Sequence, residues 1–134
     1  MFFMKLRSEL RKQAMTYLYQ IDVLQTNKVP CDIEEILTND SSTRDDFIKD
    51  IVFGVEKNKP EIDEIANKYL KNWRIDRLDK TGAAILRMAI YEMKYLDTPP
   101  IVVINEAIEL AKIYTDEELV KMINAVLDKY MKDL

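Results

Sequence analysis

The chain has 134 residues, 20 basic and 24 acidic side chains, and a formal net charge of −4, and 48% of its residues are hydrophobic. This length and composition are typical of one globular domain spanning residues 1–134. The chain has no histidine and only two glycines, which excludes catalytic triads, histidine-based metal sites, P-loops and glycine-rich dinucleotide-binding loops.

The first two predicted helices lie between residues 5 and 37. A long helix over 5–25 is indicated by apolar residues at helical spacing, namely Leu6, Leu10, Ala14, Tyr17, Leu18, Ile21 and Leu24. The residues 29–31 break this pattern. Asp32 then has the position of an N-cap, and Glu35 that of the acid of a capping box. We therefore predict a short second helix that ends at about Leu37.

The next three predicted helices follow a loop over 39–42. Ser42 or Thr43 is expected to cap a third helix, whose apolar face carries Phe47, Ile48, Ile51, Val52 and Val55. Pro60 suits the first position of a fourth helix, which reaches about residue 70. The residues 73–76 are predicted to form a bend before a fifth helix over about 77–96.

The remaining sequence predicts two more helices. Pro99 and Pro100 end the fifth helix, because proline disfavours helix in its predecessor and cannot continue one itself. A sixth helix is expected over about 102–114. The residues 115–118, TDEE, have the pattern of a capping box that opens a seventh helix. No segment alternates with the period of a strand, so we predict an all-α fold of about seven helices.

The fifth predicted helix is apolar on two faces. Gly82, Leu86, Ala89 and Met93 fall on one face, and Ala84, Met88, Tyr91 and Tyr95 fall nearly opposite. A helix of this kind is usually central to the fold and packed between two layers. Alternatively, the second face is a partner-binding surface, since aromatic residues and methionine are enriched at interfaces. The sequence leaves both interpretations open.

A basic segment opens this acidic chain. The cations Lys5, Arg7, Arg11 and Lys12, with one acidic residue, give residues 1–14 a net charge of +3. Arg7, Arg11, Met15 and Tyr19 follow one i, i+4 row of the first helix. Guanidinium groups match phosphate geometry and an aromatic ring can stack on an unpaired base, so the row suits single-stranded RNA. The same charges also suit an ordinary solvated helix face.

The sequence indicates neither a membrane span nor a cofactor. The longest apolar run, residues 101–104, is far shorter than the about 20 residues that a spanning helix needs. Cys31 is the only cysteine and cannot form an internal disulfide, which is typical of a reducing cytoplasm. Acidic residues are plentiful, but no pair stands out. We therefore predict a cytoplasmic protein without a cofactor, a metal site or catalytic residues.

Four motifs give the chain a family resemblance. The residues 103–112 read VINEAIELAK and 123–128 read INAVLD, while AILRMAIYE stands at 84–92 and LYQID at 18–22. In this order, from about residue 5 to 132, they resemble the NusB family of bacterial transcription antitermination factors. The resemblance implies a non-enzymatic protein of two small helical bundles, which we expect to divide into residues 1–58 and 59–134.

The resemblance also implies partners. Members of the family bind the boxA element of ribosomal-RNA transcripts as a heterodimer with NusE, a protein of the small ribosomal subunit. The pair helps to load the antitermination complex on RNA polymerase and keeps ribosomal-RNA transcription processive. In the family, an arginine-rich segment of the first helix contributes to RNA binding. Here that segment falls on Arg7 and Arg11, with Lys5 and Lys12 as neighbours, and Tyr19 matches the tyrosine of the family's LY pair.

Several residues depart from the family pattern. Ser8 and Glu9 dilute the basic segment, which predicts weaker attraction of phosphates. Met122 stands where the family often has an aromatic residue, and it cannot stack on a base. Asn124 is retained, and either an RNA contact or a local structural hydrogen bond would explain it.

The sequence has two alternative interpretations beside RNA binding with NusE. The tyrosine and methionine side chains of the fifth helix could bury themselves in a homodimer, which would make the protein a helical interaction scaffold. The same helical domain also occurs fused to ribosomal-RNA cytosine methyltransferases. This chain has neither the length nor the glycine-rich loop of a methyl-donor domain, which argues against that enzyme.

Overall fold

The structure is a computed structural model that describes the backbone of residues 2–38 and 46–134 and the side chains of residues 7–38 and 46–134. Its helices are α1 (Phe2–Thr26), α2 (Ile33–Thr38), α3 (Asp46–Lys57), α4 (Lys59–Tyr69), α5 (Lys80–Tyr95), α6 (Pro100–Tyr114) and α7 (Glu117–Lys132), with a 3-10 turn, η1 (Ile75–Arg77). The described residues include no strand, and the prediction of an all-α fold with about seven helices is confirmed.

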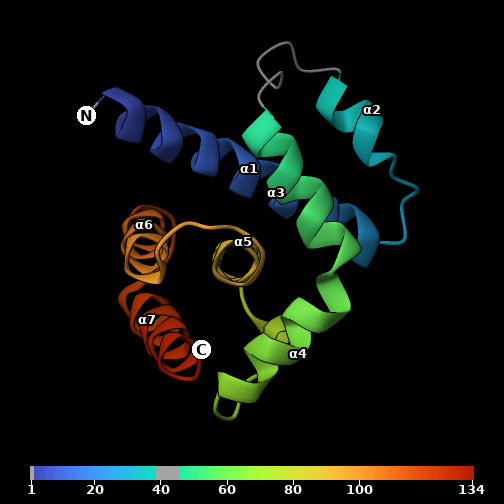
Figure 1. The fold of residues 1–134 in the computed structure, drawn as a ribbon. Coiled ribbons are helices and arrows are strands. Elements are labelled where there is room, and N and C mark those ends of the chain that lie inside the picture. Colours follow the sequence, from blue (N-terminus) through green and yellow to red (C-terminus); the bar gives the residue numbers. More distant parts are fainter. Residues whose placement is uncertain (1, 39–45) are drawn as a thin grey trace.

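The helix α5 lies at the centre of the fold (Figure 1). It packs against α1, α3, α4, α6 and α7, and every residue from 82 to 93 is buried. The prediction of a central helix packed on two sides is therefore confirmed. Ala84, Met88 and Tyr91 are buried, so the prediction that they form a partner-binding surface is wrong. The proposed division of the chain near residue 58 stays a prediction.

Most of the predicted helix ends agree with the structure. The Asp32 carboxylate accepts hydrogen bonds from the backbone N–H groups of Glu34 and Glu35 at 3.1 and 3.4 Å, so it caps α2 as expected. Pro60 occupies the first turn of α4. The helix α6 begins at Pro100, two residues earlier than predicted, because proline fits the first helical position. The predicted cap of the third helix, Ser42 or Thr43, lies outside the described residues.

Two predicted boundaries differ from the structure. The helix α5 begins at Lys80 and not at about 77, because residues 75–77 form the turn η1, whose Ile75 side chain is buried. Asp79 caps α5 by accepting a hydrogen bond from the Gly82 N–H at 3.3 Å. At the start of α7 the cap is Asp116, which accepts from Leu119 N–H at 2.8 Å. Thr115 instead donates its hydroxyl to the Ala111 carbonyl at 2.7 Å.

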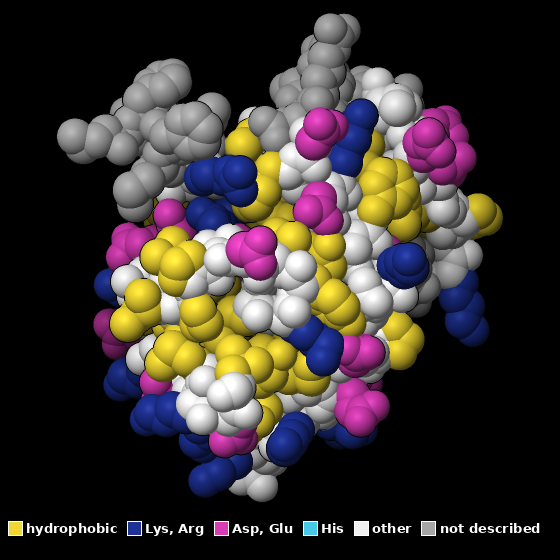
Figure 2. All heavy atoms as spheres, in the orientation of Figure 1, with side chains coloured by type: hydrophobic (Ala, Val, Ile, Leu, Met, Phe, Trp, Pro, Cys, Tyr) yellow, Lys and Arg dark blue, Asp and Glu magenta, His cyan; other side chains and the backbone are white. Residues whose placement is uncertain are grey.

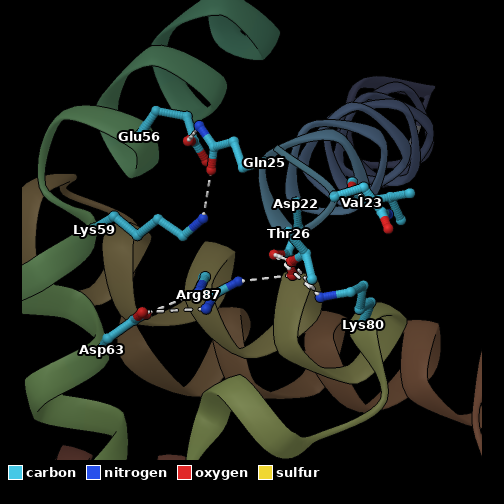
Figure 3. Close-up of polar contacts among 10 residues, drawn as sticks. Asp22, Val23, Gln25, Thr26, Glu56, Lys59, Asp63, Lys80 and Arg87 are labelled. Atoms are coloured by element: carbon cyan, nitrogen blue, oxygen red, sulfur yellow. Dashed lines mark hydrogen bonds and ion pairs between the residues drawn. The ribbon is translucent and has the colours of Figure 1, made fainter. Parts of the chain in front are cut away.

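A buried arginine joins three helices (Figure 3). Arg87 of α5 donates to Asp63 of α4 through Nε at 2.8 Å and Nη2 at 3.1 Å, and to Asp22 of α1 through Nη1 at 3.1 Å. Lys80 Nζ lies 3.4 Å from the second Asp22 oxygen. Burial raises the pKa of Asp22, but the charges of Arg87, Lys59 and Lys80 outweigh it and hold this pKa below its usual value.

This cluster predicts how stability responds to acid. Because the folded-state pKa of Asp22 is lowered, its contribution is present above the unfolded-state pKa of about 3.9 and is lost as pH falls through the folded-state pKa. Between pH 5 and pH 3 the free energy of unfolding of the unmodified chain should therefore decrease more than that of Asp22→Asn, which should already be less stable at pH 7. Urea denaturation at several pH values measures both. The surface variant Glu109→Gln is the control, and identical pH profiles for Asp22→Asn and the unmodified chain would contradict the prediction.

A glycine of α3 allows close packing on α5. A Cβ atom at Gly54 would overlap with the ring of Tyr91, whose hydroxyl donates to Asp50 Oδ1 at 2.6 Å. Gly54→Ala should therefore displace this ring and lower the free energy of unfolding by about 1–3 kcal/mol, despite the roughly 1 kcal/mol gained in helix propensity. Gly82→Ala should cost less in the same urea denaturation, because its Cβ would meet the flexible end of Leu119. Equal losses in the free energy of unfolding for Gly54→Ala and Gly82→Ala would contradict the importance of the close contact between Gly54 and the Tyr91 ring.

Candidate nucleic-acid interface

The side chains of Arg7 and Arg11, in the basic segment, point toward the protein core and not toward solvent. The Arg7 guanidinium lies 4.0 Å from the centroid of the Phe47 ring, and that of Arg11 lies 5.5 Å from it. Arg11 is only 4% exposed. Its Nε and Nη2 each donate to a Glu92 carboxylate oxygen at 2.9 Å, and its Nη1 lies 3.6 Å from Glu106 Oε1. Direct RNA contact through Arg11 would therefore require breaking a buried ion pair.

The groove beside these arginines is acidic. A hollow of about 760 Å³ lies between α1, α3 and the start of α6. Arg7 and Arg11 line it, together with the four acidic residues Asp46, Asp50, Asp97 and Glu106. The carboxylates outnumber the guanidinium groups, so the groove does not attract phosphate. This side of α1 therefore attaches the helix to the core and is a poor candidate for an RNA surface.

The exposed face of α1 carries a different set of residues. Lys12, Thr16 and Tyr19 are exposed, and Tyr19 has 42% of its surface accessible. At the helical period, Tyr19 lies roughly 20° around the helix from Lys12 and roughly 80° from Arg11. Tyr19 thus continues the face of Lys12, which corrects the single row predicted from Arg7 through Arg11 to Tyr19. The side chain of Lys5 lies outside the described residues.

Asn124 is exposed on α7, away from this face of α1. The helix α7 packs against α4, α5 and α6, whereas α1 packs against α3 and α5, so the two helices lie on different sides of the central helix (Figure 1). Met122 is half-buried and packs against the core. The structure therefore does not bring Asn124 together with Lys12 and Tyr19, and its RNA contact stays a prediction.

Tyr95 is the exposed member of the predicted partner surface, with 39% of its surface accessible. Its ring stacks on Tyr91 with centroids 5.2 Å apart, and its hydroxyl donates to Glu61 Oε1 at 2.6 Å. Lys94 Nζ lies 3.0 Å from the same oxygen. The hydrogen bonds from Tyr95 and Lys94 lower the pKa of Glu61. Figure 2, in which α5 is viewed along its axis, shows hydrophobic side chains gathered in the middle of this face of the molecule.

Sequence reasoning missed the carboxylates that hold Arg11. Glu92 lies in the middle of a buried helix and is 1% exposed, and Glu106 belongs to the VINEAIELAK motif and accepts the Ser8 hydroxyl at 2.9 Å. A charged residue between apolar residues on both sides of a helix indicates a buried ion pair, because an unpaired charge there is costly. That signal was present in the sequence, but it does not identify the partner.

The described residues place neither a metal-binding cluster nor a membrane-spanning helix beside this surface. Within the described part of the chain, no three or more Cys, Asp or Glu side chains are placed to hold a metal ion. No described helix is both long and apolar enough to span a bilayer. The thiol of Cys31 is free and half-buried, and burial together with Glu56 and Asp32 raises its pKa.

Comparison with known proteins assigns the chain to a family. A sequence model described as the NusB family matches residues 8–132. The chain belongs to the NusB family. Curated relatives of this NusB-family chain include the transcription antitermination protein NusB of Listeria innocua, 45% identical over 90% of this chain and 92% of its own. That of Staphylococcus haemolyticus is 42% identical over 90% and 95%, and that of Bacillus pumilus is 38% identical over 96% of each.

Solved NusB structures share the fold. The structure of T. maritima NusB matches with a TM-score of 0.81 and 32% identity, over 95% of this chain and 91% of that one. A chain from a crystal structure of the antitermination factors NusB and NusE in complex with dsRNA matches with a TM-score of 0.79 and 25% identity. That alignment covers 98% of this chain and 99% of the other. Both alignments therefore cover nearly all of this NusB-family chain.

The Arg11–Glu92 pair predicts a large stability effect. In Glu92→Ala, the Arg11 guanidinium would remain buried, and its ion pairs among the described residues would be reduced to the 3.6 Å contact with Glu106. Removing one partner of a buried ion pair costs about 3–5 kcal/mol, so the free energy of unfolding should fall by that amount. Urea denaturation measures the change, with Glu109→Ala as the control because its pair with Lys112 is exposed. A loss below about 1 kcal/mol would contradict the structural role of this pair.

Proposed function

We propose that this chain is a transcription antitermination factor that binds single-stranded, boxA-like RNA of ribosomal-RNA transcripts together with NusE. As part of the antitermination complex on RNA polymerase, it supports processive ribosomal-RNA transcription. The observation that carries the proposal is its likeness to NusB proteins along nearly the whole chain. A structural neighbour that contains NusB, NusE and dsRNA supports the choice of partners.

The exposed face of α1 is the first candidate for RNA contact. Lys12 supplies an ammonium group for phosphates, and Tyr19 supplies a ring on which an unpaired base can stack. Arg7 is half-buried over Phe47, roughly 140° around α1 from Lys12, and is a secondary candidate. Lys5 and Asn124 remain further candidates. Arg11 acts as a positioning residue, because its pair with Glu92 fixes how α1 lies on α5.

We assign Tyr95 to the partner surface as a candidate, since it is exposed at the end of α5. The proposed role is that of a binding protein without catalysis, a cofactor or a metal. Histidine is absent from the chain, which suits this role. The proposed place of action is the cytoplasm, where bacterial transcripts are made. The two helical subdomains, about 1–58 and 59–134, are likewise proposed.

An RNA titration tests the proposal. Binding of a fluorescent boxA-like oligonucleotide is measured by anisotropy, with and without NusE, at two salt concentrations. NusE should increase the affinity. Lys12→Gln should lower the affinity and reduce the salt slope by about 0.7, and Tyr19→Ala should weaken binding by the roughly 1–3 kcal/mol of one stacked base. Lys57→Gln and Phe53→Ala, which alter exposed residues of α3, are the matched controls.

Two outcomes would sink the proposal. One is the absence of RNA binding in the presence of NusE. The other is equal binding of boxA-like and scrambled oligonucleotides. Duplex RNA is included for comparison, because the neighbouring structure contains dsRNA. Light scattering over a concentration series measures whether the chain instead forms the alternative homodimer.

A further inference from the structure

The connection between α4 and α5 presents a tryptophan on a fixed backbone. Trp73 has 48% of its surface exposed, whereas Ile75 and Leu78 of the same connection are buried. The Ile75 N–H donates to the Asn67 side-chain oxygen at 2.8 Å, which ties the connection to α4. Asn72 has a φ of 63°, a left-handed conformation that asparagine tolerates better than most residues. The position of Trp73 is therefore set by its neighbours and not by its own packing.

Two arginines lie beside the exposed ring. A hollow of about 300 Å³ is lined by Asn72, Trp73, Arg74 and Arg77. The lining contains no carboxylate. The Arg74 side chain is 64% exposed, and its Nε lies 3.5 Å from the equally exposed Asp76, a contact that solvent weakens. Arg77 is exposed and has no ion-pair partner among the residues that the structure describes. Both guanidinium groups are thus available to an anion.

The ring of Trp73 also borders an acidic region. A second hollow, of about 240 Å³, is lined by Trp73 and Arg77 together with Asp79, Asp116 and Glu118. The carboxylates of Asp79 and Asp116 already cap α5 and α7. Phosphates are therefore favoured in the first hollow, which Arg74 and Arg77 line, and disfavoured in the second, which the cap carboxylates line. A polyanion is therefore drawn to the hollow that Arg74 lines.

This site is joined to the helix that carries Tyr19. Lys80, the first residue of α5, donates to Thr26 of α1 at 2.8 Å and to Asp22 at 3.4 Å. Its neighbour in the chain, Asp79, lines the hollow beside Trp73. The C-terminal half of α1 and the Trp73 connection therefore meet at the start of α5.

We propose that Trp73, Arg74 and Arg77 form a second contact site for single-stranded RNA, in which an unpaired base stacks on the indole and the adjoining phosphates bind the two arginines. The inference rests on the proposed function, and it names a site for the same strand beyond the Lys12–Tyr19 face. A nucleic acid fits because it alternates planar bases with phosphates, as the site alternates an exposed ring with guanidinium groups. An acidic peptide would use the arginines but would leave the ring exposed.

The chain itself supplies a probe, because Trp73 is its only tryptophan. Titration with single-stranded boxA-like RNA should change the Trp73 fluorescence, with the same midpoint as anisotropy of labelled RNA. Inorganic polyphosphate of equal charge should compete for binding but change the fluorescence far less, since it cannot stack. The variant Trp73→Phe, titrated in the same way, gives the fluorescence change that comes from NusE and not from Trp73. RNA binding without a fluorescence change, or a change caused by NusE alone, would overturn the site.

Affinities of matched variants give an independent test. Trp73→Ala should weaken RNA binding about 5- to 100-fold, whereas Trp73→Phe should retain most of the affinity. Phe53→Ala removes an exposed ring elsewhere and should have no effect. Arg74→Gln and Arg77→Gln should each reduce the salt slope by about 0.7. Thermal unfolding should be nearly unchanged in all of them, because these side chains are exposed.

The outcomes separate this inference from the proposed function. If Tyr19→Ala weakens RNA binding and Trp73→Ala does not, the second site is wrong and the proposed function stands. If the unmodified chain binds no RNA with NusE present, both fail.

Discussion

Two buried ion pairs between α1 and α5 determine how the rest of the structure is arranged. The helix α1 contributes a cation, Arg11, to the anion Glu92, and an anion, Asp22, to the cation Arg87. Reversing the direction of α1 would place Arg11 beside Arg87 and Asp22 beside Glu92, so that like charges would meet in the core. Since an unpaired buried charge costs several kcal/mol, only one direction of α1 on α5 satisfies all four groups.

This arrangement also decides which face of α1 is available to a ligand. Drawing Arg11 inward to Glu92 leaves Lys12, the next residue and about 100° around the helix, exposed to solvent. Tyr19, seven residues after Lys12, returns to the same exposed face. The ion pair that attaches α1 to α5 thus leaves Lys12 and Tyr19, the proposed RNA contacts, exposed to solvent.

The proposed RNA contacts use few cations, which suits a chain with a net charge of −4. Each contact between a cation and a phosphate adds to the salt-dependent part of the binding free energy. Because this chain offers few such contacts, its attraction to RNA through charge alone is weak. Aromatic stacking on Tyr19 and Trp73 adds affinity that depends little on salt. The two rings lie on different elements, α1 and the connection between α4 and α5, and the proposal assigns them to separate nucleotides of one strand.

Much of the fold was determined by the sequence alone. Helical periodicity, the cap at Asp32 and the prolines at 60, 99 and 100 are local signals, and they placed most helices within a few residues. The family followed from motifs such as VINEAIELAK. The start of α5 was missed because η1 depends on burying Ile75, a tertiary contact. Asp116 replaced Thr115 as the cap of α7 because a carboxylate accepts the hydrogen bond there.

Only the tertiary structure decided which side chains are exposed at the site. Arg11 finds Glu92 at a separation of 81 residues, and no periodicity within one helix reveals so distant a partner. Ala84, Met88 and Tyr91 have the pattern of a spare apolar face, but all three are buried, and Tyr91 packs on Gly54 of α3. Helical periodicity could not predict that Trp73 is exposed, because Trp73 lies in a connection whose position is set by the buried side chains of Ile75 and Leu78. A sequence determines where its helices form, but the burial of each charge depends on which distant charge it meets.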